Sequence, residues 1–188
     1  MQTKEDILRL IQSDTEMMEI IKTADTLNLP DWWICAGFLR SKIWDTIHGF
    51  NERTRIPDVD VIYYDHANID ESLEKELENV LKDMMPSVPW SVKNQARMHT
   101  INNSLPYVSS EDAISKFPET VTALGITLNQ NKQLVFSAPW GLDDVINLDV
   151  KPTPFYTESK ERAVIYEKRI INKNWESIWF KVKIHHLL

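Results

Sequence analysis

Two aspartates in an alternating pattern are the residues of this chain best suited to chemistry. Asp58 and Asp60 are separated by one valine, and the residues after them, Val61 to Tyr64, are apolar or aromatic. Because side chains alternate between the two faces of a strand, we expect both carboxylates on one face. Two neighbouring carboxylates repel each other unless a cation lies between them. Mg²⁺ commonly binds one or two carboxylates together with water and substrate phosphates, so the pair predicts a magnesium site.

A glycine at the start of a predicted helix is the second candidate site. The apolar run from Trp32 to Ala36 predicts a short buried strand, and the apolar spacing after Gly37 predicts a helix that ends at Gly49. A small residue at this turn lets a phosphate approach the free N–H groups of the helix N-terminus. Arg40 and Ser41 lie one turn further on and are candidate phosphate ligands. A tight turn without a ligand is the alternative.

The remaining periodic patterns predict the elements that must position these side chains. Two successive helices are expected before Pro30, and a further helix follows Asp70. Predicted strands cover residues 58–64, 90–96, 121–128 and 133–137, the last two as a hairpin, while a short helix near Ser110 and a charged helix over 158–172 complete the pattern.

Several segments of the chain resemble the nucleotidyltransferase superfamily, which has the polymerase-beta-like fold. In that superfamily a strand leads into a Gly-Gly or Gly-Ser turn and a helix, and the next strand carries Asp-x-Asp. The chain also resembles a bacterial family of nucleotidyltransferase-like proteins of unknown substrate, over about residues 32–154. The segments that carry the resemblance are Ala36–Ser41, Ile43–Asp45, Pro57–Val61, Trp90–His99, Pro118–Thr120 and Ala138–Asp144.

This resemblance implies an α+β fold with a mixed β-sheet flanked by helices. It implies that Mg²⁺ bound by Asp58 and Asp60 assists transfer of a nucleoside monophosphate from a nucleoside triphosphate to an acceptor. A third acid on a neighbouring strand usually completes such a site, yet residues 90–96 contain none. Asn94 stands at the expected position and completes the predicted catalytic set, and Arg97 is a candidate phosphate ligand. Other candidates for the missing acid are Asp112, Glu119, Asp143 and Asp144.

Two departures from the superfamily pattern leave other functions open. Phe38 stands where a second Gly or a Ser is usual, and the amide of Asn94 cannot accept a proton at neutral pH. A catalytically inactive nucleotide-binding or regulatory module of the same fold is therefore the alternative. A third hypothesis is an interaction protein that uses the Trp-rich segment 175–184, which requires Trp175 and Trp179 to be exposed.

Composition limits the class of protein and its partners. The 188 residues, 43% of them hydrophobic, predict a nucleotidyltransferase-like domain over 1–154 and a helical C-terminal extension over 155–188. The net charge of −7 argues against a nucleic-acid partner and favours a small acceptor. Cys35, the one cysteine, is expected to pack as a small buried hydrophobe. Neither a signal peptide nor an apolar run long enough for a membrane span is evident, so we expect a cytoplasmic protein.

Overall fold

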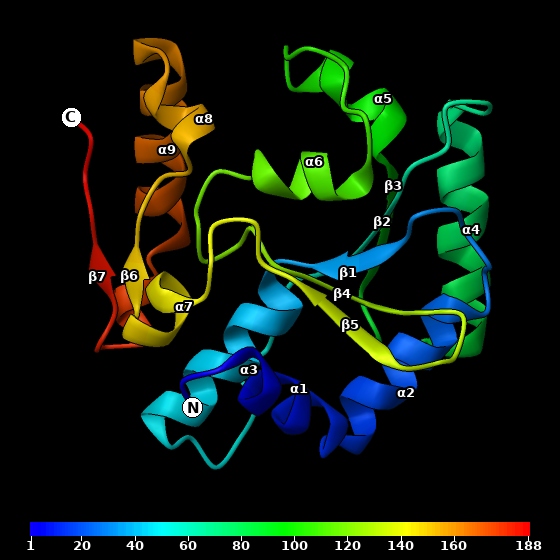
Figure 1. The fold of residues 1–188 in the computed structure, drawn as a ribbon, viewed down its shortest axis with the longest axis horizontal. Helices are drawn as coiled ribbons and strands as arrows, with labels where there is room; N and C mark the ends of the chain where they lie inside the picture. Colours follow the sequence, from blue (N-terminus) through cyan, green and yellow to red (C-terminus); the bar gives the residue numbers. More distant parts are fainter.

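A mixed five-stranded β-sheet lies at the centre of the fold (Figure 1). The computed structural model describes all residues from Met1 to Leu188. The strands are β1 (Trp33–Cys35), β2 (Val59–Tyr63), β3 (Trp90–Asn94), β4 (Gly125–Leu128) and β5 (Leu134–Ser137), in the order β3-β2-β1-β4-β5. Within this sheet, β2 and β3 are parallel and every other pair is antiparallel. The α+β fold with a mixed sheet is therefore confirmed.

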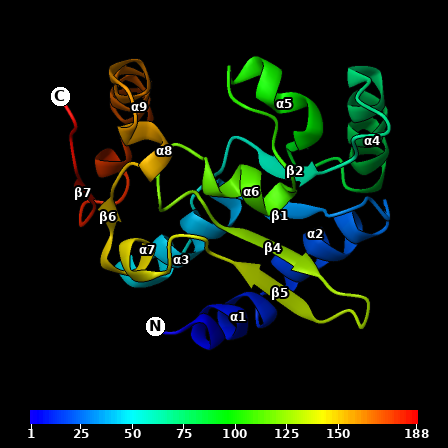
Figure 2. The same ribbon diagram turned by 45° about the horizontal axis from the view of Figure 1, so that its top comes forward.

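Helices cover both faces of this sheet. In Figures 1 and 2, α1 (Lys4–Gln12), α2 (Thr15–Asp25) and α3 (Gly37–His48) lie on one side, while α5 (Gln95–Ile101) and α6 (Ser110–Ser115) lie on the other. Helix α4 (Glu71–Met84) packs beside β3. The remaining elements are α7 (Asp143–Asn147), β6 (Asp149–Val150), α8 (Pro154–Thr157), α9 (Lys160–Lys173), the 3₁₀ helix η1 (Trp175–Ser177) and β7 (Lys183–Ile184). None of the helices has the length and apolar character that a membrane span requires.

The C-terminal segment packs into the same hydrophobic core as the sheet. Its residues Tyr166, Ile170, Trp175, Trp179 and Val182 belong to the main cluster of 32 buried residues. Trp175 and Trp179 are only 3% and 2% exposed. The interaction-protein hypothesis required these two tryptophans to be exposed. Because they are buried, the hypothesis loses its basis.

Asp45 of α3 holds two distant segments against this helix. Its carboxylate accepts hydrogen bonds from the backbone N–H and hydroxyl of Thr54, at 2.8 and 2.7 Å, and from Nε1 of Trp179 at 2.8 Å. The side chain is 5% exposed, so these three donors replace the water that a buried carboxylate loses. The loop before β2 and the C-terminal segment are thereby tied to α3.

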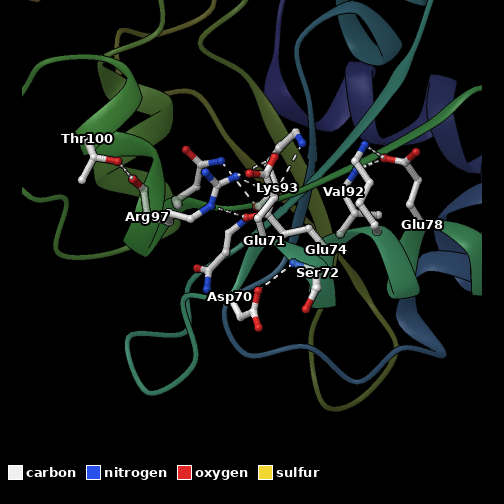
Figure 3. A network of polar contacts seen from close by, with 12 residues as sticks. Asp70, Glu71, Ser72, Glu74, Glu78, Val92, Lys93, Arg97 and Thr100 are labelled. Carbon is white, nitrogen blue, oxygen red and sulfur yellow. Dashed lines mark hydrogen bonds and ion pairs between the residues drawn. The ribbon is translucent and has the colours of Figure 1, made fainter.

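A second buried carboxylate fixes the end of β3 (Figure 3). Glu74 of α4 is fully buried and accepts hydrogen bonds from Nε and Nη2 of Arg97, at 3.0 and 2.9 Å, and from the backbone N–H of Asn94 at 3.1 Å. Lys93 adds a contact at 3.4 Å. The prediction that the strand continued to Ala96 is wrong, because the Asn94 side chain caps α5 and Arg97 lies on that helix.

We predict that Glu74→Gln destabilises the protein by about 3 kcal/mol, because it removes the buried charge that pairs with Arg97 and leaves this guanidinium only the exposed Glu71, at 3.6 Å. Urea unfolding followed by circular dichroism measures this loss. Glu76→Gln, on the exposed face of the same helix, is the matched control and is expected to change the free energy of unfolding by less than about 0.5 kcal/mol. Equal unfolding midpoints for the two variants would contradict the proposed importance of this ion pair.

Candidate active site

Asp60 is the second residue of β2, and Asp58 directly precedes the strand, beside the first turn of α3. Val59 and Val61 are buried at 1% and 0% exposure, and the alternation of a strand directs Asp60 to the opposite face. Asp60 pairs across the sheet with Cys35 of β1 on one side and with Ser91 of β3 on the other. The charge of Asp58 acts on Asp60, so the two carboxylates lie near each other.

The environment of Asp60 disfavours its ionised form. Burial and the negative charge of Asp58 raise the pKa of the Asp60 carboxyl to about 6, although a hydrogen bond with Ser91 and the charges of Arg169 and Lys173 act in the opposite direction. A cation between the two carboxylates would remove the unfavourable repulsion. The donor set therefore fits Mg²⁺.

No third protein ligand accompanies this pair, since no group of three His, Cys, Asp or Glu side chains is arranged to hold a metal ion. Mg²⁺ accepts such a site, because it usually keeps several waters and binds substrate phosphates alongside one or two carboxylates.

A cavity of about 230 Å³ opens in front of Asp60. Its walls come from the α3 N-terminus, the segments around α6, and helices α8 and α9; they include Ala36, Tyr107, Lys116, Tyr156 and Arg169. Sequence reasoning missed Tyr107, Lys116, Tyr156 and Arg169, because they lie outside the segments that carry the resemblance. The only signal was the charged helical pattern over 158–172.

The turn between β1 and α3 leaves space at the helix N-terminus. Ala36, the N-cap, has φ +54° and ψ −116°, and no side chain caps the helix. A Cβ added at Gly37 would meet only Nη2 of Arg40, at 3.9 Å. The N–H groups of Leu39 and Arg40 donate to the Ala36 carbonyl, so those of Gly37 and Phe38 are the ones available to an anion. The strained position is Ala36, one residue before the glycine.

Phe38 and Ser41 point away from Asp60. They line, with Val59, a separate cavity of about 320 Å³ on the other face of the sheet. Phe38 is 4% exposed and belongs to the main core, so its bulk does not narrow the turn at Gly37. The Ser41 hydroxyl accepts a hydrogen bond from Nη2 of Arg40 at 3.2 Å. A direct contact between Ser41 and a phosphate beside Asp60 has no support in this geometry.

Arg40 is enclosed by aromatic rings. Its guanidinium carbon lies 4.5 Å from the ring centroid of Trp175, 5.1 Å from Trp44 and 5.2 Å from Trp179, and its Nε has no hydrogen-bond partner. Burial lowers the pKa of Arg40 to about 10, while the negative charges of Glu119, Asp45 and Asp58 raise it. Arg40 is therefore a charged residue beneath the helix N-terminus, held by cation–π contacts from the C-terminal segment.

Asn94 does not stand beside Asp60. In the parallel register, Asn94 pairs with Tyr63, whereas Ser91 pairs with Asp60. The Asn94 amide donates to the carbonyls of Asp65 and Asn68, both at 2.8 Å, and its oxygen accepts from the N–H groups of Asp65 and Ala96, at 3.0 and 3.1 Å. These bonds give Asn94 a structural role in the turn after β3. Arg97 is likewise occupied by Glu74.

The sheet positions beside Asp60, where a third acid could stand, hold uncharged residues. In the row of the sheet that contains Asp60, the neighbours are Ser91, Cys35, Gly125 and Ser137. A Cβ at Gly125 would lie 2.8 Å from Ile114 and 3.0 Å from Trp33, so a larger side chain does not fit there. Of the acids considered from the sequence, Asp112 pairs with Lys116, Glu119 with Arg169 and Asp144 with Lys151, while Asp143 is exposed.

We predict that Asn94→Asp destabilises the protein by about 3 kcal/mol, because a carboxylate oxygen would replace an amide donor against two backbone carbonyls. Thermal melts with and without Mg²⁺ measure the effect. Mg²⁺ is expected to raise the midpoint of the variant by no more than that of the wild type. A larger Mg²⁺-dependent rise in the variant would instead place Asn94 at the metal site.

Known proteins similar to this chain share its fold. The family model described as nucleotidyltransferase matches residues 22–184. A structure solved by NMR and described as revealing a CCA-adding enzyme head domain is 33% identical, with a TM-score of 0.89; the match covers 99% of this chain and 97% of that one. No match was found among curated proteins.

Two CCA-adding enzymes with longer chains resemble the fold at lower identity. A CCA-adding enzyme in complex with CTP is 13% identical with a TM-score of 0.58, and the match covers 97% of this chain and 43% of that chain. The Thermotoga maritima CCA-adding enzyme complexed with tRNA is 14% identical with a TM-score of 0.57, at 97% and 42% coverage. This chain therefore spans less than half the length of these two enzymes.

Proposed function

The chain belongs to the nucleotidyltransferase family, and from this premise we propose that it transfers a nucleoside monophosphate from a nucleoside triphosphate to an acceptor hydroxyl. The observation that carries the proposal is the pair Asp58 and Asp60 beside the open N-terminus of α3. This arrangement combines two oxygen ligands for a divalent cation with N–H groups for an anion.

We propose that Asp58 and Asp60 hold Mg²⁺, which when bound neutralises phosphate charge and favours departure of pyrophosphate. The residues of the chain bind and orient the donor. The first turn of α3, reached past Gly37, receives phosphate oxygens, and Arg40 beneath it contributes a buried positive charge. Ser41, Arg97 and Asn94 are left out of the proposed contact set because their polar groups are turned away or already bonded.

The acceptor is proposed to be a small hydroxyl compound, on the strength of the net charge of −7. Charge alone does not support excluding nucleic acid, since one structure with the same fold is complexed with tRNA. Transfer from labelled nucleoside triphosphates to tRNA and to a panel of small hydroxyl compounds separates the two acceptor classes.

A catalytically inactive nucleotide-binding module is the second candidate function. It is favoured by the absence of a third acid in the row of Asp60, where Gly125 is packed against Ile114 and Trp33. Such a module binds Mg²⁺ and a nucleoside triphosphate together but releases no pyrophosphate. Release of pyrophosphate in the presence of any acceptor would decide for the enzyme.

We predict that Asp60→Asn lowers the affinity for Mg²⁺–nucleoside triphosphate by about tenfold or more, because one metal-binding charge is lost. The same variant is expected to melt at a higher temperature than the wild type without metal, since burial of a second negative charge beside Asp58 is relieved. Calorimetric titration and thermal melts measure both effects. Asp83→Asn, exposed on α4, is the control. Unchanged nucleotide affinity in Asp60→Asn would remove the proposed metal site.

A further inference from the structure

Arg169 of α9 enters the cavity in front of Asp60 with part of its guanidinium unused. Its Nε donates to Oε1 of Glu119 at 2.6 Å. Its two terminal nitrogens make no hydrogen bond to the protein, and the side chain is 34% exposed. The guanidinium thus has Nε held by the protein and two terminal nitrogens without a protein partner, and Arg169 is one of the residues that line the cavity.

The carboxylate that holds Arg169 is itself immobilised. Glu119 is fully buried, and its Oε2 accepts a hydrogen bond from the Thr122 hydroxyl at 2.6 Å. The Glu119 carbonyl accepts from the backbone N–H groups of Thr122 and Ala123, at 3.1 and 3.0 Å. Burying a carboxylate is unfavourable unless its charge is compensated, so the pairing with Arg169 is maintained in the folded protein.

The other cations near the cavity are less suited to a phosphate. Arg40 is 7% exposed and faces tryptophan rings. Lys116 is paired with Asp112 at 2.9 Å and lies 5.0 Å from the ring centroid of Tyr107. Arg97 is held in a bidentate pair by Glu74. Arg169 is therefore the cation of this cavity with a free pair of donors.

We propose that Arg169 binds the triphosphate of the donor nucleotide with its two terminal nitrogens, and that Glu119 is the positioning residue that orients it. The planar fork of an arginine matches two phosphate oxygens, and a fixed fork loses less side-chain entropy on binding. The proposal rests on the proposed function, because it assumes that a nucleotide enters the cavity of Asp60.

This assignment makes the C-terminal segment part of the binding site. Helix α9 supplies Arg169, while the residues after it enclose Arg40 under α3. Arg169 would then bind the phosphate chain directly, Arg40 would add its buried charge from beneath the first turn of α3, and Asp58 and Asp60 would hold the metal ion. Residues 155–188 are accordingly required for binding.

The test measures calorimetric binding of Mg²⁺–tripolyphosphate, a probe without a base or sugar. Arg169→Gln is expected to lower its affinity by about 10- to 100-fold, since two charge-assisted hydrogen bonds are lost. Lys168→Gln removes the same charge from the adjacent exposed position of α9 and is expected to leave affinity within about twofold of the wild type. Arg169→Lys keeps the charge without the fork and is expected to fall between them.

Glu119→Gln tests the positioning role through a double-mutant cycle. It is expected to weaken tripolyphosphate binding in the wild-type background but to have no further effect on affinity in Arg169→Gln. Equal losses in both backgrounds would show that Glu119 acts only on the fold. If Arg169→Gln does not fold, the comparison of Arg169→Lys with Lys168→Gln decides the proposal, and equal affinities of those two would overturn it.

The outcomes also separate this proposal from the proposed function. Consider first that the wild type binds the probe and that Asp60→Asn weakens this binding. If Arg169→Gln then binds as tightly as Lys168→Gln, the role of Arg169 is overturned while the proposed function stands. If Asp60→Asn and Arg169→Gln both bind like the wild type, or the wild type binds neither tripolyphosphate nor a nucleotide, both proposals are overturned.

Discussion

The burial of Asp60 next to Asp58 is the constraint on which the candidate site depends. Burial and the negative charge of Asp58 both disfavour the ionised form of Asp60, and the raised pKa of its carboxyl reflects these two effects. The surrounding structure compensates with positive groups: Arg40, Arg169 and the open N-terminus of α3 all lie at this side of the sheet. Under the proposed function, these groups would receive a ligand that carries both a divalent cation and phosphate charge.

Two buried carboxylates other than Asp58 and Asp60 each orient a neighbouring arginine side chain. Glu74 holds Nε and Nη2 of Arg97 together and thereby fixes the turn after β3, whereas Glu119 holds only Nε of Arg169. Both acids are fully buried, yet the first engages two nitrogens of its arginine and the second leaves both terminal nitrogens without a protein partner. The first ion pair stabilises the fold, and under the proposed function the second would present Arg169 to a ligand.

The C-terminal segment connects these features. Trp175 and Trp179 pack on Trp44 and enclose Arg40, and Nε1 of Trp179 donates to Asp45 on the same helix. Asp45 also anchors the loop that leads into β2. The position of α3 and of its first turn thus depends on residues more than 120 positions later in the chain.

The sequence by itself determined the strand that contains Asp60 and the helix that begins at Gly37. These follow from local rules, since alternation along a strand and the spacing of apolar residues act within a few positions. The sheet register is not local: it decided that Ser91, and not Asn94, stands beside Asp60. Side-chain pairing between distant segments likewise bound Arg97 to Glu74 and directed Arg169 into the cavity. Only the tertiary structure decides such contacts, because both partners must first be brought together by the packing of α4 and α9.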